Sequence, residues 1–334
     1  MTRREIIKQG GIALTALALP FPLTSFSKIN LMTNNKNFEV IIIGGSYSGL
    51  SAAMALGRAL RNVLIIDSGL PCNRQTPHSH NFITQDGAQP NEIAEKSKKQ
   101  VLKYESIKFV NDFAITSKKT DDGFAIITKK GAEYTAKKII FATGVKDLIP
   151  DIKGFSECWG ISVIHCPYCH GYEVKSERTG ILANGNFAFH YAQLIRNWTK
   201  DLTIFTNGKS TLTQEQTDKI IKHNIPIIEK EIEYLKQENG TIKHIVFKDN
   251  SEFNLKAIYS RPAFEQHCKI PEQLGCELTE QGLLKVDMFQ KTTIENVFAC
   301  GDNTSPMRSV ANAVATGNVV GAIVNNIMTE EEFN

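Results

Sequence analysis

One segment near the start of the chain constrains the fold more than any other. Residues 38–43 form a short apolar run, as expected of a buried parallel strand. A glycine-rich stretch at residues 44–49 follows, then a helical pattern, then a second apolar run at residues 63–66 that ends at Asp67. This order predicts a strand–helix–strand unit that binds a dinucleotide, because the helix N-terminus offers free N–H groups to a pyrophosphate and the acid can reach a ribose.

Four residues of this unit are candidate nucleotide ligands. Gly44 permits the tight turn, and Gly49 lets the helix pack close to the strand. Ser46 stands where a glycine is usual, at the point where the backbone approaches the phosphates, and a small side chain is tolerable there. Asp67 lies 23 residues after Gly44, close to the spacing of about 20 residues in this fingerprint.

Composition and charge narrow the class of protein. With 334 residues, 42% of them apolar and 22% charged, the chain has the composition of a globular protein of about two domains. Its net charge of +3 is carried by residues 1–30, so the remainder has no basic excess to attract nucleic acid or an anionic membrane. Seven cysteines are too few, and odd in number, for a disulfide framework. We also expect no membrane span, because no apolar run reaches ~20 residues.

The first 35 residues have the pattern of an export signal. Arg3 and Arg4 come first, an apolar stretch follows at residues 10–23, and small residues at 16–18 or 25–27 could precede a cleavage site. The arginine pair is typical of a twin-arginine signal, a route that carries folded proteins. A short amphipathic helix with a basic start and an uncleaved anchor stay open as alternatives. We therefore expect a periplasmic or other extracytoplasmic enzyme, or a cytoplasmic one if the signal is not used.

A Cys-x-x-Cys motif lies at the middle of the chain. Cys166 and Cys169 can close a small disulfide ring, and thiols in such motifs often have a lowered pKa, which supplies the thiolate that attacks disulfides. His165 and His170 flank the pair and could stabilise that thiolate or carry protons. A metal site built from the two cysteines, His170 and another histidine is the alternative. The other cysteines form no second close pair, and we predict no metal.

Together these motifs resemble one known family. The chain is similar to low-molecular-weight thioredoxin reductases and the related dithiol oxidases, within the class II pyridine nucleotide-disulfide oxidoreductases. The resemblance covers residues 36–328. It depends on the turn at residues 44–49, Asp67, Ala-Thr-Gly at residues 142–144, the cysteine pair, and Gly301 with Asp302.

The resemblance implies an α/β fold with two Rossmann-like, three-layer dinucleotide-binding domains. The NAD(P)-type domain is expected to be inserted into a split FAD domain, since the two flavin motifs lie about 250 residues apart. The expected parts are a signal and linker at residues 1–35, the first half of the FAD domain at 36–146, the NAD(P)-like domain with the cysteine pair at 147–261, and the second FAD half at 262–334.

The resemblance implies FAD as the cofactor. Asp302, directly after Gly301, would hold the ribityl chain, and the N-terminus of the next helix, at Ser309 and Val310, would lie by the isoalloxazine. Asn81 falls where family members place an asparagine near the flavin.

The resemblance also divides the work between the cysteines. Cys169 would face the flavin, and Cys166 would exchange with the external thiol. Thioredoxin reductases usually carry an aspartate directly after the pair, whereas this chain has His170, which is more similar to the dithiol oxidases. His170 is therefore the candidate acid–base residue.

The segment expected to bind NADPH departs from the family pattern. Against Gly-x-Gly-x-x-Ala, the chain has Ala183, Gly185 and Ala188, with two phenylalanines at the helix start. The usual His-Arg-Arg for the 2′-phosphate is absent, and a lone Lys209 is a poor substitute for an arginine fork. We expect a Rossmann-like scaffold that binds NAD(P)H weakly or not at all.

These observations predict an FAD-dependent thiol–disulfide oxidoreductase that oxidises dithiols through Cys166 and Cys169 and passes the electrons to oxygen or another acceptor. The alternatives are an NAD(P)H-dependent thioredoxin reductase and, as a non-enzyme, a degenerate flavoprotein that acts as a binding module. The expected substrate is a small dithiol or a thioredoxin-like protein. The resemblance implies a homodimer.

Outside these motifs, three segments have simple patterns. Residues 91–104 predict an amphipathic surface helix, and residues 109–128 and 242–259 each predict a β-hairpin.

Overall fold

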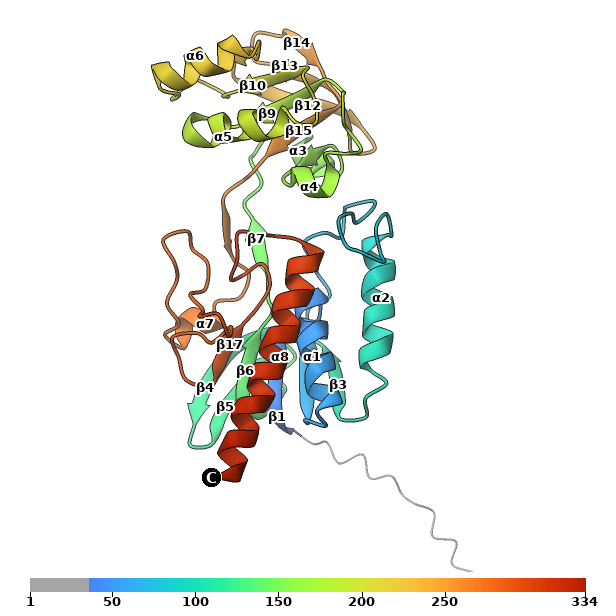
Figure 1. The fold of residues 1–334 in the computed structure, drawn as a ribbon, viewed down its shortest axis with the longest axis vertical. Coiled ribbons are helices and arrows are strands. Elements are labelled where there is room, and N and C mark those ends of the chain that lie inside the picture. The colour runs from blue at the N-terminus through green and yellow to red at the C-terminus, as the bar shows by residue number, and fades with distance from the viewer. Residues whose placement is uncertain (1–35) are drawn as a thin grey trace, which may run out of the picture. The chain divides into compact units, whose positions relative to one another are not determined.

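The structure is a computed structural model that describes residues 36–334, so the predicted signal at residues 1–35 lies outside the described residues. The chain forms a mixed seven-stranded sheet, a parallel five-stranded sheet and two smaller antiparallel sheets (Figure 1). The strands of the first sheet are β1 (Asn37–Ile43), β2 (Val63–Asp67), β3 (Ile107–Asn111), β4 (Ala114–Thr120), β5 (Gly123–Thr128), β6 (Glu133–Phe141) and β17 (Val297–Ala299). Their order is β3-β2-β1-β6-β5-β4, and β17 pairs with the end of β6.

Helices and loops cover both faces of this first sheet. Its helices are α1 (Tyr47–Arg58), α2 (Pro90–Val101), α7 (Ile270–Gln273) and α8 (Val310–Phe333). Val40 and Ile42 of β1 join buried residues of α1 and α8, whereas Ile41 and Ile43 point the other way and join buried residues of β5, β6 and residues 268–284. The alternation follows from the two-residue period of a strand and gives the three layers expected.

The second large sheet is parallel and has five strands in the order β11-β10-β9-β15-β8. These strands are β8 (Val163–Ile164), β9 (Thr179–Leu182), β10 (Leu202–Phe205), β11 (Ile227–Ile228) and β15 (Ala257–Ser260). Its helices are α3 (Phe155–Cys158), α4 (Pro167–His170), α5 (Gly185–Ile195) and α6 (Gln214–Lys222). An antiparallel sheet of β12 (Ile232–Glu238), β13 (Thr241–Phe247) and β14 (Glu252–Asn254) lies between β11 and β15 in the sequence.

Two short strands carry the chain out of the first sheet and back. They are β7 (Val145–Asp147) and β16 (Phe264–Gln266), which pair antiparallel. All strands of the five-stranded sheet lie between them in the sequence, whereas the first sheet takes strands from before β7 and after β16. The predicted fold class, two Rossmann-like domains with one inserted into the other, is therefore confirmed.

Of the three simple segments, the helix is present and the two hairpins are shorter than predicted. The helix expected at residues 91–104 is present as α2. The hairpin expected over residues 109–128 is shorter, because β3 pairs parallel with β2 and only β4 and β5 form a hairpin. In the same way β13 and β14 form a hairpin, but β15 joins the five-stranded sheet. Apolar runs in parallel and antiparallel strands look alike in sequence, which explains both errors.

Helices α1 and α8 lie side by side over the first sheet and approach each other at glycines (Figure 1). A Cβ added at Gly317 would lie 2.2 Å from the Ser48 carbonyl oxygen, and one added at Gly321 would lie 2.6 Å from that of Ala52. The Ser51 hydroxyl also donates a hydrogen bond of 2.7 Å to the Val314 carbonyl of α8. The contact is therefore one of backbone against backbone.

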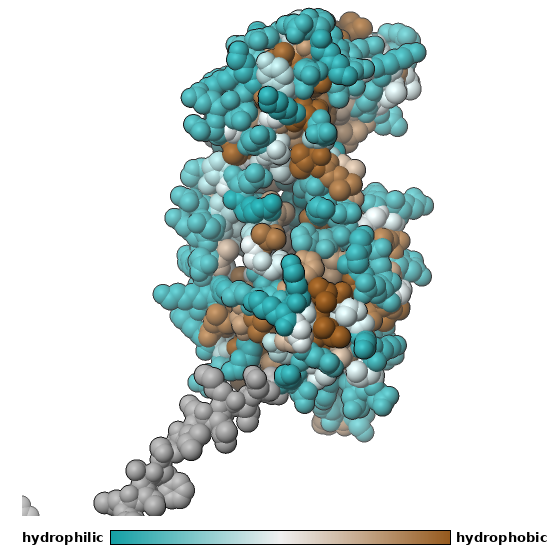
Figure 2. Space-filling view, turned by 180° about the vertical axis from the view of Figure 1, so that it is seen from behind, coloured by the Kyte–Doolittle hydropathy of each residue, from teal (hydrophilic) through white to brown (hydrophobic). Residues whose placement is uncertain are grey.

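By length and composition, α8 is the one described helix that could cross a membrane. Within it, however, Ala313, Gly317, Val320, Gly321, Val324 and Met328 are buried in the protein. This continuous buried face identifies α8 as a core helix, and the described part of the chain contains no clear membrane span. On the face shown in Figure 2, hydrophilic side chains cover most of the surface and hydrophobic ones form separate patches, as is ordinary for globular proteins.

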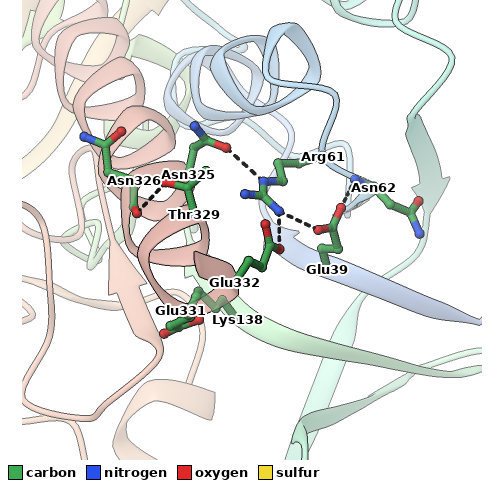
Figure 3. Close-up of polar contacts among 9 residues, drawn as sticks. All are labelled: Glu39, Arg61, Asn62, Lys138, Asn325, Asn326, Thr329, Glu331 and Glu332. Atoms are coloured by element: carbon green, nitrogen blue, oxygen red, sulfur yellow. Dashed lines mark hydrogen bonds and ion pairs between the residues drawn. The ribbon is translucent and has the colours of Figure 1, made fainter. Parts of the chain in front are cut away.

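Ion pairs hold the C-terminal end of α8 (Figure 3). The Arg61 guanidinium pairs with Glu39 at 2.9 Å and with Glu332 at 2.5 Å. Lys138 of β6, whose side chain is only 2% exposed, pairs with Glu331 at 2.6 Å. Arg61 lies in the connection between α1 and β2, and Lys138 lies in the first sheet. The pairs therefore tie the last turns of α8 to its own domain.

Candidate functional site

One cavity of about 830 Å³ joins most of the residues predicted for the site. This volume lies within the range of about 300–1,000 Å³ that is common for cofactor sites. Its lining includes the predicted residues Gly44, Ser46, Asp67, Cys169, His170, Asp302, Ser309 and Val310. The structure therefore brings the glycine turn, the cysteine motif and the start of α8 to one place.

The glycine turn forms one wall of the cavity. Gly44 has φ +105°, and a Cβ there would lie 2.2 Å from the Ala142 carbonyl oxygen. A Cβ at Gly49 would lie 1.9 Å from the Gly44 carbonyl oxygen, so Gly49 does not line the cavity but lets α1 start directly against the turn. The Ser46 side chain makes no capping bond to α1. This 12-residue helix therefore keeps N–H groups at its start for an anion.

Asp67 has a second task that the sequence pattern did not reveal. One carboxylate oxygen accepts a hydrogen bond of 2.8 Å from the Gly45 N–H, and the other accepts one of 3.2 Å from the Gly69 N–H. Asp67 thus fixes the shape of the turn and still lines the cavity. A carboxylate has further lone pairs, so these bonds are compatible with a ribose hydroxyl.

The opposite wall holds a buried charge cluster around Arg308. Its Nη1 and Nη2 atoms bind the two Asp147 oxygens at 2.7 and 3.0 Å, and its Nε lies 3.5 Å from an oxygen of Asp302. Burial raises the pKa of Asp302, and Arg308 partly offsets this. Burial opposes the charge on Arg308, but the Asp147 ion pair outweighs it and raises the pKa of the guanidinium. Arg308 was not predicted, although it directly precedes the predicted Ser309.

The start of α8 also lines the cavity and is capped by a side chain. The Ser309 hydroxyl accepts a hydrogen bond of 3.1 Å from the Asn312 N–H and so caps the helix. The amide nitrogen of the Asn312 side chain is buried and has no hydrogen-bond partner among residues 36–334. Gly301 has φ +90° and packs on Ser48 behind the cavity wall rather than lining it. The glycine turn and the capped start of α8, which both line the cavity, fit a long, polar ligand such as a flavin dinucleotide.

Cys166 and Cys169 form a disulfide at the four-residue helix α4. Cys166 is the N-cap of this helix, and its sulfur accepts a hydrogen bond of 3.1 Å from the Cys169 N–H. Cys169 and His170 line the cavity, whereas Cys166 does not. No group of three or more potential metal ligands is found within residues 36–334.

The two histidines that flank the pair are held in the uncharged form. Burial lowers the pKa of His165 to about 3, and the positive charge of Arg308 acts in the same direction. Burial also lowers the pKa of His170, with Glu173 raising it and His80 lowering it further. A neutral imidazole next to the disulfide can accept a proton from a thiol.

Two residues of the loop before α2 differ from expectation. Asn81, predicted near the flavin, is exposed and outside the cavity lining, and its N–H donates to Asp86 at 2.8 Å. Its neighbour His80 lines the cavity instead, with its ring 6.4 Å from that of His170. Asn81 has φ +59°, in the left-handed region that asparagine tolerates better than most residues. In this loop it is therefore His80, and not Asn81, that lines the cavity.

The second glycine turn, at the start of α5, is filled by the protein itself. The Asn184 carboxamide oxygen accepts hydrogen bonds from the N–H groups of Gly185 and Thr211, both at 2.8 Å, and from the Thr211 hydroxyl at 3.0 Å. Its amide nitrogen donates to the Lys209 carbonyl at 2.9 Å. The Thr211 hydroxyl also lies 2.9 Å from where a Cβ of Gly185 would be. The Asn184 side chain therefore uses the N–H of Gly185 at the start of α5, and Thr211 lies against the same turn.

Comparisons with known proteins agree with this geometry. A family model for pyridine nucleotide-disulphide oxidoreductases matches residues 38–317. Thioredoxin reductase tcpT of Claviceps purpurea is 32% identical over 301 residues, covering 87% of this chain and 94% of that protein. Thioredoxin reductase sirT of Leptosphaeria maculans is 32% identical over 305 residues, covering 86% and 93%. The crystal structure of an oxidoreductase from Agrobacterium tumefaciens has a TM-score of 0.82 at 35% identity, covering 88% of this chain and 99% of its own.

The fold and the site together define a disulfide oxidoreductase with dinucleotide-binding domains. More closely, the chain belongs to the pyridine nucleotide-disulphide oxidoreductase family, and it is a flavin-dependent oxidoreductase of the thioredoxin reductase-like type.

Proposed function

We propose that this protein is an FAD-dependent dithiol oxidase. In this proposal the Cys166–Cys169 disulfide accepts electrons from a dithiol substrate, and dioxygen is the final acceptor. The observation that carries the proposal is the contrast between the two glycine turns. The first opens on the cavity that Cys169 lines, whereas the second is filled by Asn184 and Thr211. Electrons therefore have a route in from thiols and no evident route in from NAD(P)H.

The residues of the first domain suit FAD. Gly44, Ser46 and the start of α1 would take the pyrophosphate, and Asp67 a ribose. Asp302 would bind the ribityl chain, with Ser309 and Val310 next to the ring system. The chemistry that FAD supplies when bound is transfer of the electron pair of the reduced cysteines to dioxygen, which becomes hydrogen peroxide.

The chain's own residues would perform the thiol exchange. A substrate thiolate attacks the Cys166 sulfur, the Cys166–Cys169 bond breaks, and Cys169 leaves as a thiolate. The second substrate thiol, once deprotonated, attacks the substrate sulfur of the mixed disulfide, which releases the oxidised substrate and Cys166 as a thiolate. Neutral His170 accepts a proton from an incoming thiol. Over the whole cycle, one dithiol and one dioxygen give one disulfide and one hydrogen peroxide.

Anaerobic mixing of the purified protein tests the proposal. Addition of dithiothreitol should bleach the visible flavin absorbance, and admission of air should restore it with one peroxide formed per dithiothreitol oxidised. NADPH at the same concentration should bleach it much more slowly. Rapid bleaching by NADPH, together with no peroxide from the dithiol, would overturn the proposal.

The second candidate is an NAD(P)H-dependent reductase that acts on a thioredoxin-like protein. The names of the relatives favour it, since both matched fungal proteins are called thioredoxin reductases. In that case NADPH and a thioredoxin-like partner would together sustain turnover. The same mixing experiment separates the two candidates.

Two further features belong to this proposal. Export through the twin-arginine-type signal at residues 1–35 would place the enzyme where NADPH is scarce and thiols are oxidised, which suits an oxidase. A homodimer, as the family resemblance implies, is testable by light scattering of the purified protein.

A further inference from the structure

The loop between β2 and α2 brings a second histidine to the dithiol site. His80 lines the same cavity as Cys169 and His170. Its ring meets that of His170 edge to face, with 6.4 Å between ring centroids and 88° between planes. Its Nε2 lies 3.5 Å from a carboxylate oxygen of Glu173, three residues after His170.

The position of His80 is fixed by its own loop. Ser79, which is buried, pairs with Ala88 as an antiparallel bridge, with hydrogen bonds of 2.8 and 2.9 Å in that turn. Asp86 lies 3.7 Å from the other ring nitrogen of His80. The side chain of His80 is 21% exposed, so its ring stands partly in solvent and partly against the α4 segment. The His80 ring is therefore fixed in position and can exchange protons with water.

We propose that His80 is a positioning residue of the dithiol site, which together with Glu173 sets the protonation of His170 and so its capacity to accept the proton of an incoming thiol. This inference rests on the proposed function. His80 does not contact the disulfide; it acts through His170.

Two groups with opposite effects on the pKa of His170 give the proposal its physical basis. Burial is the main reason that the pKa of His170 is lowered; Glu173 raises this pKa, and His80 lowers it. The other titratable groups of this cluster are His165 on the same segment, and His78 and Asp86 on the loop. Removing Glu173 and removing His80 should therefore move the titration of His170 in opposite directions. A merely structural role of His80 would not predict opposite signs.

Three variants isolate this effect. His80→Asn removes the imidazole of His80, and Glu173→Gln removes the carboxylate of Glu173. His78→Asn is the matched control, because it makes the same change two residues away on an exposed ring outside the cavity lining. His170→Asn removes the proposed base itself.

The reaction to follow is cleavage of the Cys166–Cys169 disulfide by dithiothreitol without oxygen or nucleotide. Samples are quenched with a maleimide from pH 5 to 9 and the labelled cysteines are counted by mass spectrometry. The ionisation of dithiothreitol is common to all variants, so the ratio of each rate to that of the unaltered protein reports the enzyme's own group. Histidine ring NMR signals over the same pH range report the titration of His170 directly.

The expected result is a pair of opposite shifts. His80→Asn should raise the midpoint by about 0.5–1 pH unit, which slows cleavage roughly threefold to tenfold below it, and Glu173→Gln should lower it by a similar amount. His78→Asn should leave the midpoint unchanged, and His170→Asn should abolish the pH dependence that this midpoint describes. Unchanged midpoints in both His80→Asn and Glu173→Gln, or shifts of the same sign, overturn the inference. Because the reaction uses neither oxygen nor NADPH, opposite shifts in a protein that forms no peroxide would reject the oxidase function and keep the role of His80.

Discussion

Arg308 and Asp147 form a two-point ion pair in the wall of the cavity, with nitrogen–oxygen distances of 2.7 and 3.0 Å. Asp147 ends β7, where the chain leaves the first sheet, and Arg308 lies just before α8, which returns along that sheet. Both side chains are buried, at 11% and 9% exposed. The pair therefore joins the strand that leads to the disulfide with the helix that borders the cavity.

Replacement of Arg308 should be costly. Arg308→Ala leaves the carboxylates of Asp147 and Asp302 without their cation, and loss of one partner of a buried pair costs about 3–5 kcal/mol. Urea unfolding measures the change in the free energy of unfolding. The control is Arg178→Ala, which breaks an exposed pair with Asp201 and should cost less than about 1 kcal/mol. Equal losses in the two variants would show that the Arg308 cluster contributes no more than a surface pair.

The two cysteines should give different variants. Cys166→Ser removes the sulfur that meets the substrate, so dithiol turnover should be lost while the flavin stays bound. Cys169→Ser keeps the sulfur that meets the substrate and removes its partner. When a substrate in its disulfide form is added, the Cys166 thiolate can open that disulfide, and the resulting mixed disulfide should accumulate in mass spectra. Cys276→Ser, at a buried cysteine outside the cavity, should retain turnover. Full turnover in Cys166→Ser would contradict the mechanism.

His165 should make the protein sensitive to acid. Its pKa is lowered from 6.5 to about 3 in the folded state because of burial, so below pH 6.5 the unfolded state binds a proton that the folded state refuses. The free energy of unfolding should then fall as the pH falls from 6.5 toward 3, by up to about 1.4 kcal/mol per pH unit from this group. Urea titrations at pH 6.5 and 5 on the unaltered protein and on His165→Gln measure the difference in slope. Parallel slopes would show that His165 is not responsible.

Variants of Lys138 and Glu331 measure how much their ion pair contributes to holding the end of α8. Glu331→Ala removes the acceptor that lies 2.6 Å from a buried ammonium, which should cost about 1–3 kcal/mol in the free energy of unfolding. Lys138→Met replaces the ammonium with an apolar group of similar size and should be nearly neutral, because both the charge and its desolvation are removed. The order of the two variants in thermal melting checks this. A Lys138→Met variant that is the less stable of the two would refute the explanation.

The local patterns of the chain were sufficient for its first strand–turn–helix–strand unit. Residues 38–67 predicted β1, the glycine turn, α1 and β2 because strand, turn and helix there are set by near neighbours. Asp302 and Val310 were likewise found from one short segment. The strand partners of residues 107–111 and 257–260 were not predictable in this way, because pairing depends on which distant strand lies alongside.

The residues that were missed act through contacts distant in sequence. Arg308 acquires its role from Asp147, 161 positions earlier, and His80 acquires its role from Glu173. Nothing in the local sequence of either distinguishes it from a solvated side chain. The filling of the second glycine turn was predicted only as a weakened motif, since the bond from Thr211 to Asn184 spans 27 positions.

The glycines between α1 and α8 determine more than close packing. Both helices start at the cavity, α1 at Tyr47 beside the pyrophosphate turn and α8 at Val310 beside the expected ring system. Because backbone meets backbone at Gly317, no change of rotamer can alter the spacing between these two starting points. The contact between the two helices therefore fixes the spacing between two parts of the cavity wall, the start of α1 and the start of α8.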